Sequence, residues 1–124
     1  GKHIAEAIEL AGEDVVAEIY SGAKTGLRPI HDALMAAIQG FGTFEAAPKK
    51  GYLSLRRKRQ FAMITPATNS RVEVGINCKS LQTDERLIEM PAGSMCNYKV
   101  KVTRVDEVDE KLVGWIRQAY DNAG

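Results

Sequence analysis

The spacing of apolar residues changes twice along this chain, from a helical repeat to an alternating repeat and back again. Apolar residues recur every three or four positions over residues 2–20 and again over residues 29–41, which predicts two amphipathic helices. Over residues 52–103 they alternate with polar residues, as in strands that bury one face. The helical repeat returns over residues 108–119. Helices, then strands, then a helix is the order of an α+β fold.

The alternating region predicts four or five antiparallel strands, at residues 52–56, 60–64, 71–78, 98–103 and, as a short edge segment, 87–89. With the N-terminal and C-terminal helices packed on one sheet face, this gives a two-layer sandwich in which Asp106 caps the last helix. The other face is expected to be open, polar and mostly basic. It would carry Tyr52, Ser54, Arg56, Gln60, Arg71, Glu73, Asn77, Asn97, Lys99 and Lys101.

The register of the first hairpin follows from the residues that must share its buried face. Leu53 and Leu55 alternate on the first strand, and Phe61 and Met63 alternate on the second. We therefore predict that Leu55 lies opposite Phe61 and that Leu53 lies opposite Met63. This pairing requires a connecting loop with an odd number of residues, three or five.

The length of the chain, 124 residues, suits one domain. A hydrophobic content of 44% and a charged content of 27% are typical of a globular protein and exclude a disordered one. No apolar stretch is long enough to cross a bilayer, so no membrane partner is expected. We divide the chain into an N-terminal helical segment, residues 1–22, and one α+β domain, residues 23–124. Gly1 in place of a methionine suggests an excised piece, in which residues 1–22 link to an upstream domain.

The chain shows none of the familiar signatures of a cofactor, metal or catalytic site. Cys78 and Cys96, the only cysteines, lie in apolar strand-like contexts, which predicts free thiols in a reducing, cytoplasmic compartment. Neither the cysteines nor the histidines have metal-ligand spacing, and no phosphate-binding or dinucleotide fingerprint is present, so we expect no metal and no cofactor. No nucleophile elbow surrounds Ser94 or Cys96. His31 falls outside the apolar stripe of its helix, which predicts an exposed side chain rather than an acid–base pair with Asp32.

Charge is distributed unevenly along the chain. Residues 46–72 contain seven basic residues and no acid, so all 16 acidic residues lie outside this segment. Lysine and arginine can neutralise phosphates, and a nearby tyrosine can stack on a base. We take as candidate anion-binding residues Lys49, Lys50, Tyr52, Arg56, Arg57 and Arg59, with Lys99 and Lys101 from the late strand. The alternative is a basic hairpin tip that keeps the domain soluble and protects an edge strand from aggregation.

Residues 19–120 resemble an uncharacterised bacterial domain family, a domain of unknown function. The resemblance is carried by Tyr20-Ser21-Gly22 and by residues 47–62, 71–77, 99–102, 107–109 and 119–120. Relatives carry this domain at the C-terminal end, behind small helical or predicted nuclease-like domains, which implies an accessory module rather than a stand-alone enzyme. Relatives also have a Thr-His pair where this chain has Asn97-Tyr98, so any chemistry of that histidine would be missing here.

Three classes of function remain. We favour a non-catalytic binding module that contacts an anionic partner, nucleic acid foremost, through the basic hairpin and the open sheet face. The first alternative is a protein-interaction or dimerisation module that uses a sheet edge or the N-terminal helix. The second is an enzyme whose site the sequence does not reveal, and this is the least favoured because no catalytic motif is present.

Overall fold

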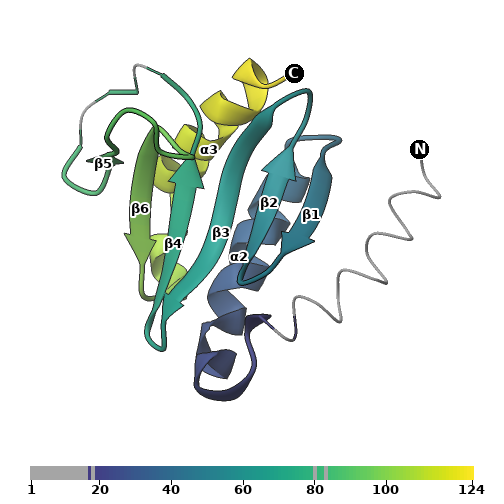
Figure 1. Ribbon diagram of the computed structural model, residues 1–124, viewed down its shortest axis with the longest axis vertical. Helices are drawn as coiled ribbons and strands as arrows, with labels where there is room; N and C mark the ends of the chain where they lie inside the picture. The colour runs from purple at the N-terminus through teal and green to yellow at the C-terminus, as the bar shows by residue number, and fades with distance from the viewer. Residues whose placement is uncertain (1–16, 18, 80, 83) are drawn as a thin grey trace.

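The computed structural model describes residues 17, 19–79, 81–82 and 84–124 (Figure 1). The helix expected over residues 2–20 lies outside these residues apart from Ala17, Ile19 and Tyr20. The described helical segments are η1 (Gly22–Leu27), α2 (Arg28–Gln39), η2 (Val105–Glu107) and α3 (Glu110–Asn122). Within the described part of the chain, no helix is long and apolar enough to cross a membrane.

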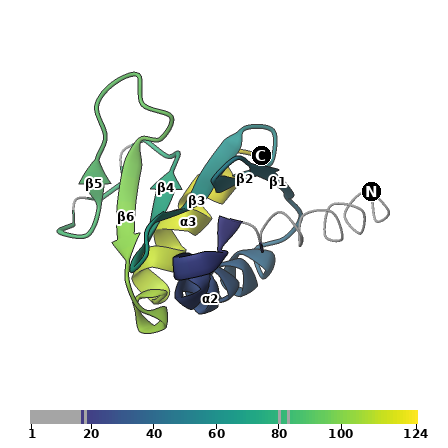
Figure 2. The same ribbon diagram turned by 60° about the horizontal axis from the view of Figure 1, so that its bottom comes forward.

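Six strands form one antiparallel sheet with the order β1-β2-β3-β4-β6-β5. The strands are β1 (Glu45–Lys49), β2 (Tyr52–Arg56), β3 (Gln60–Thr68), β4 (Arg71–Ile76), β5 (Ile88–Glu89) and β6 (Tyr98–Val102). Figures 1 and 2 show α2 and α3 on the same face of this sheet, so the α+β two-layer architecture is confirmed. Strand β1 adds to the predicted set. Its alanines and Pro48 are poor strand formers, but an edge strand tolerates proline because one side needs no ladder hydrogen bond.

The core lies between the sheet and the two helices. Alternate residues of β4 and β6 point toward the helices, and Val72, Val74, Ile76, Val100 and Val102 are fully buried. They meet the apolar stripes of the helices, Leu34 and Ile38 on α2 and Leu112 and Ile116 on α3, which are equally buried. Burial of each such side chain contributes about 1.5–3 kcal/mol to folding. The inward orientation of Cys78 is also confirmed, since its side chain is buried.

The predicted register of the β2–β3 hairpin is wrong by one residue. The loop has three residues, as expected, and Arg56 lies opposite Gln60, but a bulge follows and pairs Leu55 with Ala62 and Leu53 with Ile64. The bulge inserts Phe61 as an extra residue. Its ring is fully buried because it contacts the rings of Phe44 and Tyr120 edge-on, at centroid distances of 5.9 and 5.3 Å. Beyond the bulge every side chain changes face, so Met63 leaves the core for the open face.

The predicted start of the last helix is also wrong. Glu107 accepts hydrogen bonds from the backbone N–H groups of Thr103 and Arg104, and this folds residues Val105–Glu107 into the separate turn η2. Asp109, not Asp106, is the N-cap of α3, and its Oδ1 accepts the Leu112 N–H at 3.0 Å. This hydrogen bond, helped by Arg86, lowers the pKa of the Asp109 carboxyl, as expected for a capping carboxylate.

His31 is buried rather than exposed, which corrects the prediction made from its place on the helix. Only 4% of the residue is accessible to solvent. His31 lies three residues before Leu34 and seven before Ile38, so it borders the buried stripe of α2, and Tyr20, from the chain before η1, packs on it. Nδ1 of His31 lies 3.0 Å from the hydroxyl of Tyr20, and the two rings meet edge-on. Burial raises the pKa of Tyr20, so this hydroxyl stays protonated. His31 therefore has a packing and hydrogen-bonding role.

Candidate functional site

The candidate anion-binding residues fall into two groups at opposite ends of β2. Lys49, Lys50 and Tyr52 lie at the β1–β2 turn, and Arg56, Arg57 and Arg59 lie at the β2–β3 loop. At about 3.4 Å per residue, the length of β2 separates the groups by roughly 14 Å. They do not form one compact patch.

Strand pairing connects the first group to the far side of the open face. Lys49 pairs with Tyr52, and Glu73 pairs with both Thr65 and Lys101. Continuing the β2–β3 register by one residue places Tyr52 beside Thr65. One row therefore crosses five strands of the open face: Lys49, Tyr52, Thr65, Glu73 and Lys101. With strands about 4.8 Å apart, this row spans roughly 19 Å and has a lysine at each end.

The centre of the open face is neutralised by Glu73. Its carboxylate lies 2.9 Å from a guanidinium nitrogen of Arg71 and 3.3 Å from Nζ of Lys99. Lys99, a candidate binding residue, therefore already has an acidic partner. Lys101 is exposed and forms no ion pair with any other described residue. The open face is thus cationic at its edges and nearly neutral at its centre.

Arg57 and Arg59 bind the C-terminal end of α3. A guanidinium nitrogen of Arg57 donates to the carbonyl oxygen of Tyr120 at 3.0 Å, and the guanidinium lies 4.2 Å from the centre of the Tyr120 ring. Arg59 donates to the carbonyl of Asn122, and the backbone N–H groups of residues 58 and 59 both donate to the carbonyl of Ala123. Helix C-termini leave carbonyls unsatisfied and favour positive charge. Both arginines therefore have a structural role that their position in a basic run did not reveal.

We expect Arg57→Ala to destabilise the domain by about 1–2 kcal/mol, because it removes a cation from the carbonyl end of a helix and from an aromatic ring. The matched control is Lys58→Ala. The Lys58 side chain is exposed, and only its backbone N–H binds α3, so this change should cost less than about 0.5 kcal/mol. Urea denaturation followed by Trp115 fluorescence measures both. Equal effects of the two substitutions would contradict the structural role of Arg57.

Five cations on the strands and hairpins remain available to a partner. Within the described part of the chain, none of them forms an ion pair, and all are exposed: Lys49, Lys50, Arg56, Lys58 and Lys101. Arg56 lies opposite Glu45 across the β1–β2 pair and donates to the carbonyl of Lys58, so it is the most constrained of the five. Tyr52 is half-buried between Lys49 and β3.

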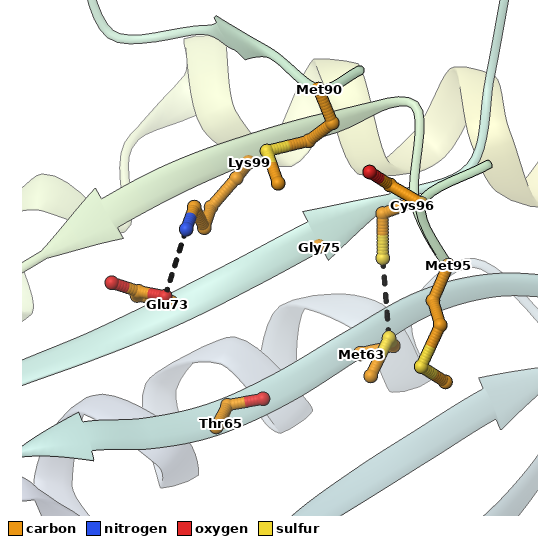
Figure 3. Close-up of a pocket in the computed structure, with 9 residues that line it drawn as sticks. Met63, Thr65, Glu73, Gly75, Met90, Met95, Cys96 and Lys99 are labelled. Atoms are coloured by element: carbon orange, nitrogen blue, oxygen red, sulfur yellow. Dashed lines mark hydrogen bonds and ion pairs between the residues drawn. The ribbon is translucent and has the colours of Figure 1, made fainter. Parts of the chain in front are cut away.

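The open face also carries a pocket that the sequence analysis did not anticipate (Figure 3). The pocket has a volume of about 180 Å³ and lies above β3, β4 and β6, under the loop that leads into β6. Its lining consists of Met63, Thr65, Glu73, Gly75, Met90, Ser94, Met95, Cys96 and Lys99. Backbone hydrogen bonds fix the loop, from Met90 N–H to the Asn97 carbonyl and from Asn97 N–H to the Ile76 carbonyl.

Cys96 projects from this loop onto the sheet. Its Sγ lies 3.2 Å from Sδ of Met63, and the close approach is possible because β4 has a glycine at position 75. Burial raises the pKa of the Cys96 thiol, and the nearby charge of Lys99 partly opposes that shift. The thiol is therefore protonated at neutral pH. The sequence did contain a signal for this arrangement, because a glycine inside a strand often marks the close approach of another segment.

One comparison with known proteins gave a match. A family described as "Domain of unknown function (DUF5655)" matches residues 16–123. The chain therefore belongs to this family, and the resemblance to an uncharacterised domain family is confirmed. Searches of curated proteins and of solved structures gave no significant match.

Proposed function

We propose that this domain is a non-catalytic module that binds single-stranded nucleic acid across its open sheet face. The observation that carries the proposal is the group of five exposed cations without acidic partners in the described structure. Surface ion pairs contribute little to stability, and unpaired cations contribute even less, so folding does not explain their number. An excess of exposed like charge raises the local concentration of an anionic partner and speeds its association.

The acid-free segment folds into one side of the sheet. Residues 46–72 form almost all of β1, all of β2 and β3, and the start of β4, and these strands are neighbours. Much of the acidic charge lies on the helix side, in η2 and α3 and just before α3. Part of the charge that is separated along the chain is thereby separated in space. An elongated polyanion that crosses the face from the β1–β2 turn toward Lys101 would follow the row that has Lys49 at one end and Lys101 at the other, past Glu73, which Arg71 and Lys99 already neutralise.

Single strands fit this face better than a duplex does. Tyr52 lies in the row between Lys49 and Thr65, where its ring can stack on an unpaired base. A duplex would not offer such a base without opening. We expect base stacking at Tyr52 and phosphate contacts from Lys49, Lys50 and Lys101. Arg57 and Arg59 are occupied at α3 and are excluded from the expected contacts.

Fluorescence anisotropy with labelled oligo-dT, oligo-U and a duplex, at low and moderate salt, tests this proposal. Lys49→Ser/Lys50→Ser should weaken single-strand binding about tenfold at low salt and reduce the slope of log K against log salt by about 1.4. Tyr52→Leu should weaken binding by roughly 1–3 kcal/mol and leave the salt slope unchanged. The charge-matched control is Lys24→Ser/Arg104→Ser, which removes two cations from η1 and from the residue before η2.

The control separates a local surface from a general effect of net charge. Equal loss of affinity in both double variants, or no binding at low salt, would contradict the proposal. The alternative, a dimerisation module, predicts self-association without nucleic acid, which sedimentation velocity at several protein concentrations detects. Pro48 and the lysines of the β1 edge disfavour strand addition at that edge. A cytoplasmic location suits this function and the two free cysteines.

A further inference from the structure

We propose that the pocket on the open sheet face binds a soft monovalent metal ion of the Cu(I) class through the sulfur atoms of Met63, Met95 and Cys96. This inference is independent of nucleic-acid binding. It rests on which side chains line the pocket, how close the sulfur atoms of Cys96 and Met63 lie, and what the surrounding charges permit.

The lining of the pocket is unusually rich in sulfur. The chain has four methionines and two cysteines, and three of the methionines and one cysteine meet here. An ordinary apolar pocket would draw on Leu, Ile, Val and Phe, which are abundant in this chain, yet none of them lines it. Met95 is 61% exposed, so burial in the core does not account for its presence. Soft sulfur donors favour Cu(I), zinc and iron–sulfur clusters, and the last two are held by several thiolate or imidazole ligands, so a site with one thiol and two thioethers favours Cu(I).

The sulfur atoms come from segments that the fold brings together. Met63 lies on β3, whereas Met90, Met95 and Cys96 belong to the loop between β5 and β6. Figure 3 shows Cys96 pointing toward Met63, with Met95 alongside on the same side and Met90 near Lys99 on the other. Metal–sulfur bonds of about 2.3 Å hold two ligand sulfurs roughly 4 Å apart. The sulfurs of Cys96 and Met63, at 3.2 Å, must separate slightly, which the flexible methionine side chain allows.

The charges around the pocket suit a monovalent ion. Binding replaces the S–H bond of Cys96 with a metal–sulfur bond and releases one proton to water, so the thiolate and the ion form a neutral pair. The charged groups that line the pocket are Glu73 and Lys99, which already pair with each other. A divalent ion bound to this one thiolate would keep a net positive charge in a half-buried site. Zn(II) also prefers several thiolate or imidazole ligands, and this pocket offers one thiol and no imidazole.

Titration with Ag(I), which cannot change oxidation state here, and with Cu(I) against a chromophoric Cu(I) chelator tests the proposal. NMR of protein labelled with ¹³C at the methionine methyl groups provides the direct readout. We expect one equivalent of Ag(I) to shift the signals of Met63 and Met95 and to leave that of Met35, on α2, unchanged. Cys96→Ser should weaken binding at least a hundredfold, and Met63→Leu and Met95→Leu roughly tenfold each. Met35→Leu and Cys78→Ser are the matched controls.

Two outcomes would overturn the site. Any accessible thiol binds Ag(I). If binding needs Cys96 but is unaffected by Met63→Leu and Met95→Leu, and the methionine methyl signals do not shift, then the thiol binds alone and the methionines are not ligands. Binding of Zn(II) as tight as that of Cu(I) would contradict selection by soft donors. The leucine substitutions nearly conserve volume, and circular dichroism checks that each variant keeps its fold.

Discussion

Ile64→Ala is expected to destabilise the domain by about 2–5 kcal/mol, whereas Met63→Ala, at the preceding position, should cost about 1 kcal/mol or less. Ile64 is 1% exposed and lies in the core. Met63 is half-buried and lines the pocket on the other face of the sheet. Adjacent residues of a strand lie on opposite faces of the sheet. The bulge after Arg56 decides that Ile64 faces the core and Met63 the open face.

Urea denaturation of both variants gives the two free energies of unfolding. The register predicted from the sequence, with Leu55 opposite Phe61, reverses the expected order, because Met63 would then be buried and Ile64 exposed. A larger loss for Met63→Ala than for Ile64→Ala would therefore contradict the bulge. Ala62→Ser gives a second test. Ala62 is fully buried beside Leu55, so a hydroxyl there should cost at least 1 kcal/mol.

Alternation predicted the faces of β4 and β6 correctly because neither strand contains a bulge. Every second residue of β4 faces the helices, as its pattern of valines and isoleucine indicates. On β3 the same rule failed at Phe61. A bulge leaves little trace in the alternating pattern of a sequence. Here it is favoured because it buries the Phe61 ring against Phe44 and Tyr120. Tyr120 is 59 residues away along the chain, so no local pattern could reveal that contact.

The candidate site was predictable in composition but not in its contacts. The sequence identified the cations, yet Arg57 and Arg59 bind carbonyls 63 residues away, at the end of α3. Lys99 likewise pairs with Glu73 on the adjacent strand. The cations that remain available are those whose side chains form no ion pair and bind no helix end in the described structure. Tertiary structure thus decides which of these cations stabilise the fold and which remain exposed.

The pocket was missed because its residues are ordinary in sequence. Methionines at positions 63, 90 and 95 have no common spacing, and metal-site rules based on histidine and cysteine do not include thioethers. Only Gly75, inside an otherwise regular β-branched strand, marked the place where another segment would approach. This glycine offers the most direct test of the loop that forms the pocket.

Gly75→Ala is expected to destabilise the domain by about 1–3 kcal/mol, the cost of overfilling a close-packed contact. A Cβ atom at this position would lie 2.3 Å from Sγ of Cys96 and 3.3 Å from its Cβ. The backbone of the loop is held by hydrogen bonds to Ile76 and within the loop, so relief of the clash requires a new rotamer of Cys96 together with a shift of the loop away from its Cβ contact. The variant should displace residues 90–97 and disrupt the pocket.

A graded set of substitutions at Cys96 separates this clash from a general loss of strand stability. Cys96→Ala removes Sγ and keeps the Cβ contact at 3.3 Å, so it should partly restore Gly75→Ala, and Cys96→Gly, which removes both contacts, should restore it further. The double-mutant cycle should give a coupling energy of about 1–2 kcal/mol. If the two changes are additive, Cys96 does not rest on β4. A favourable coupling would instead establish the contact that brings the thiol to Met63, on which the metal site depends.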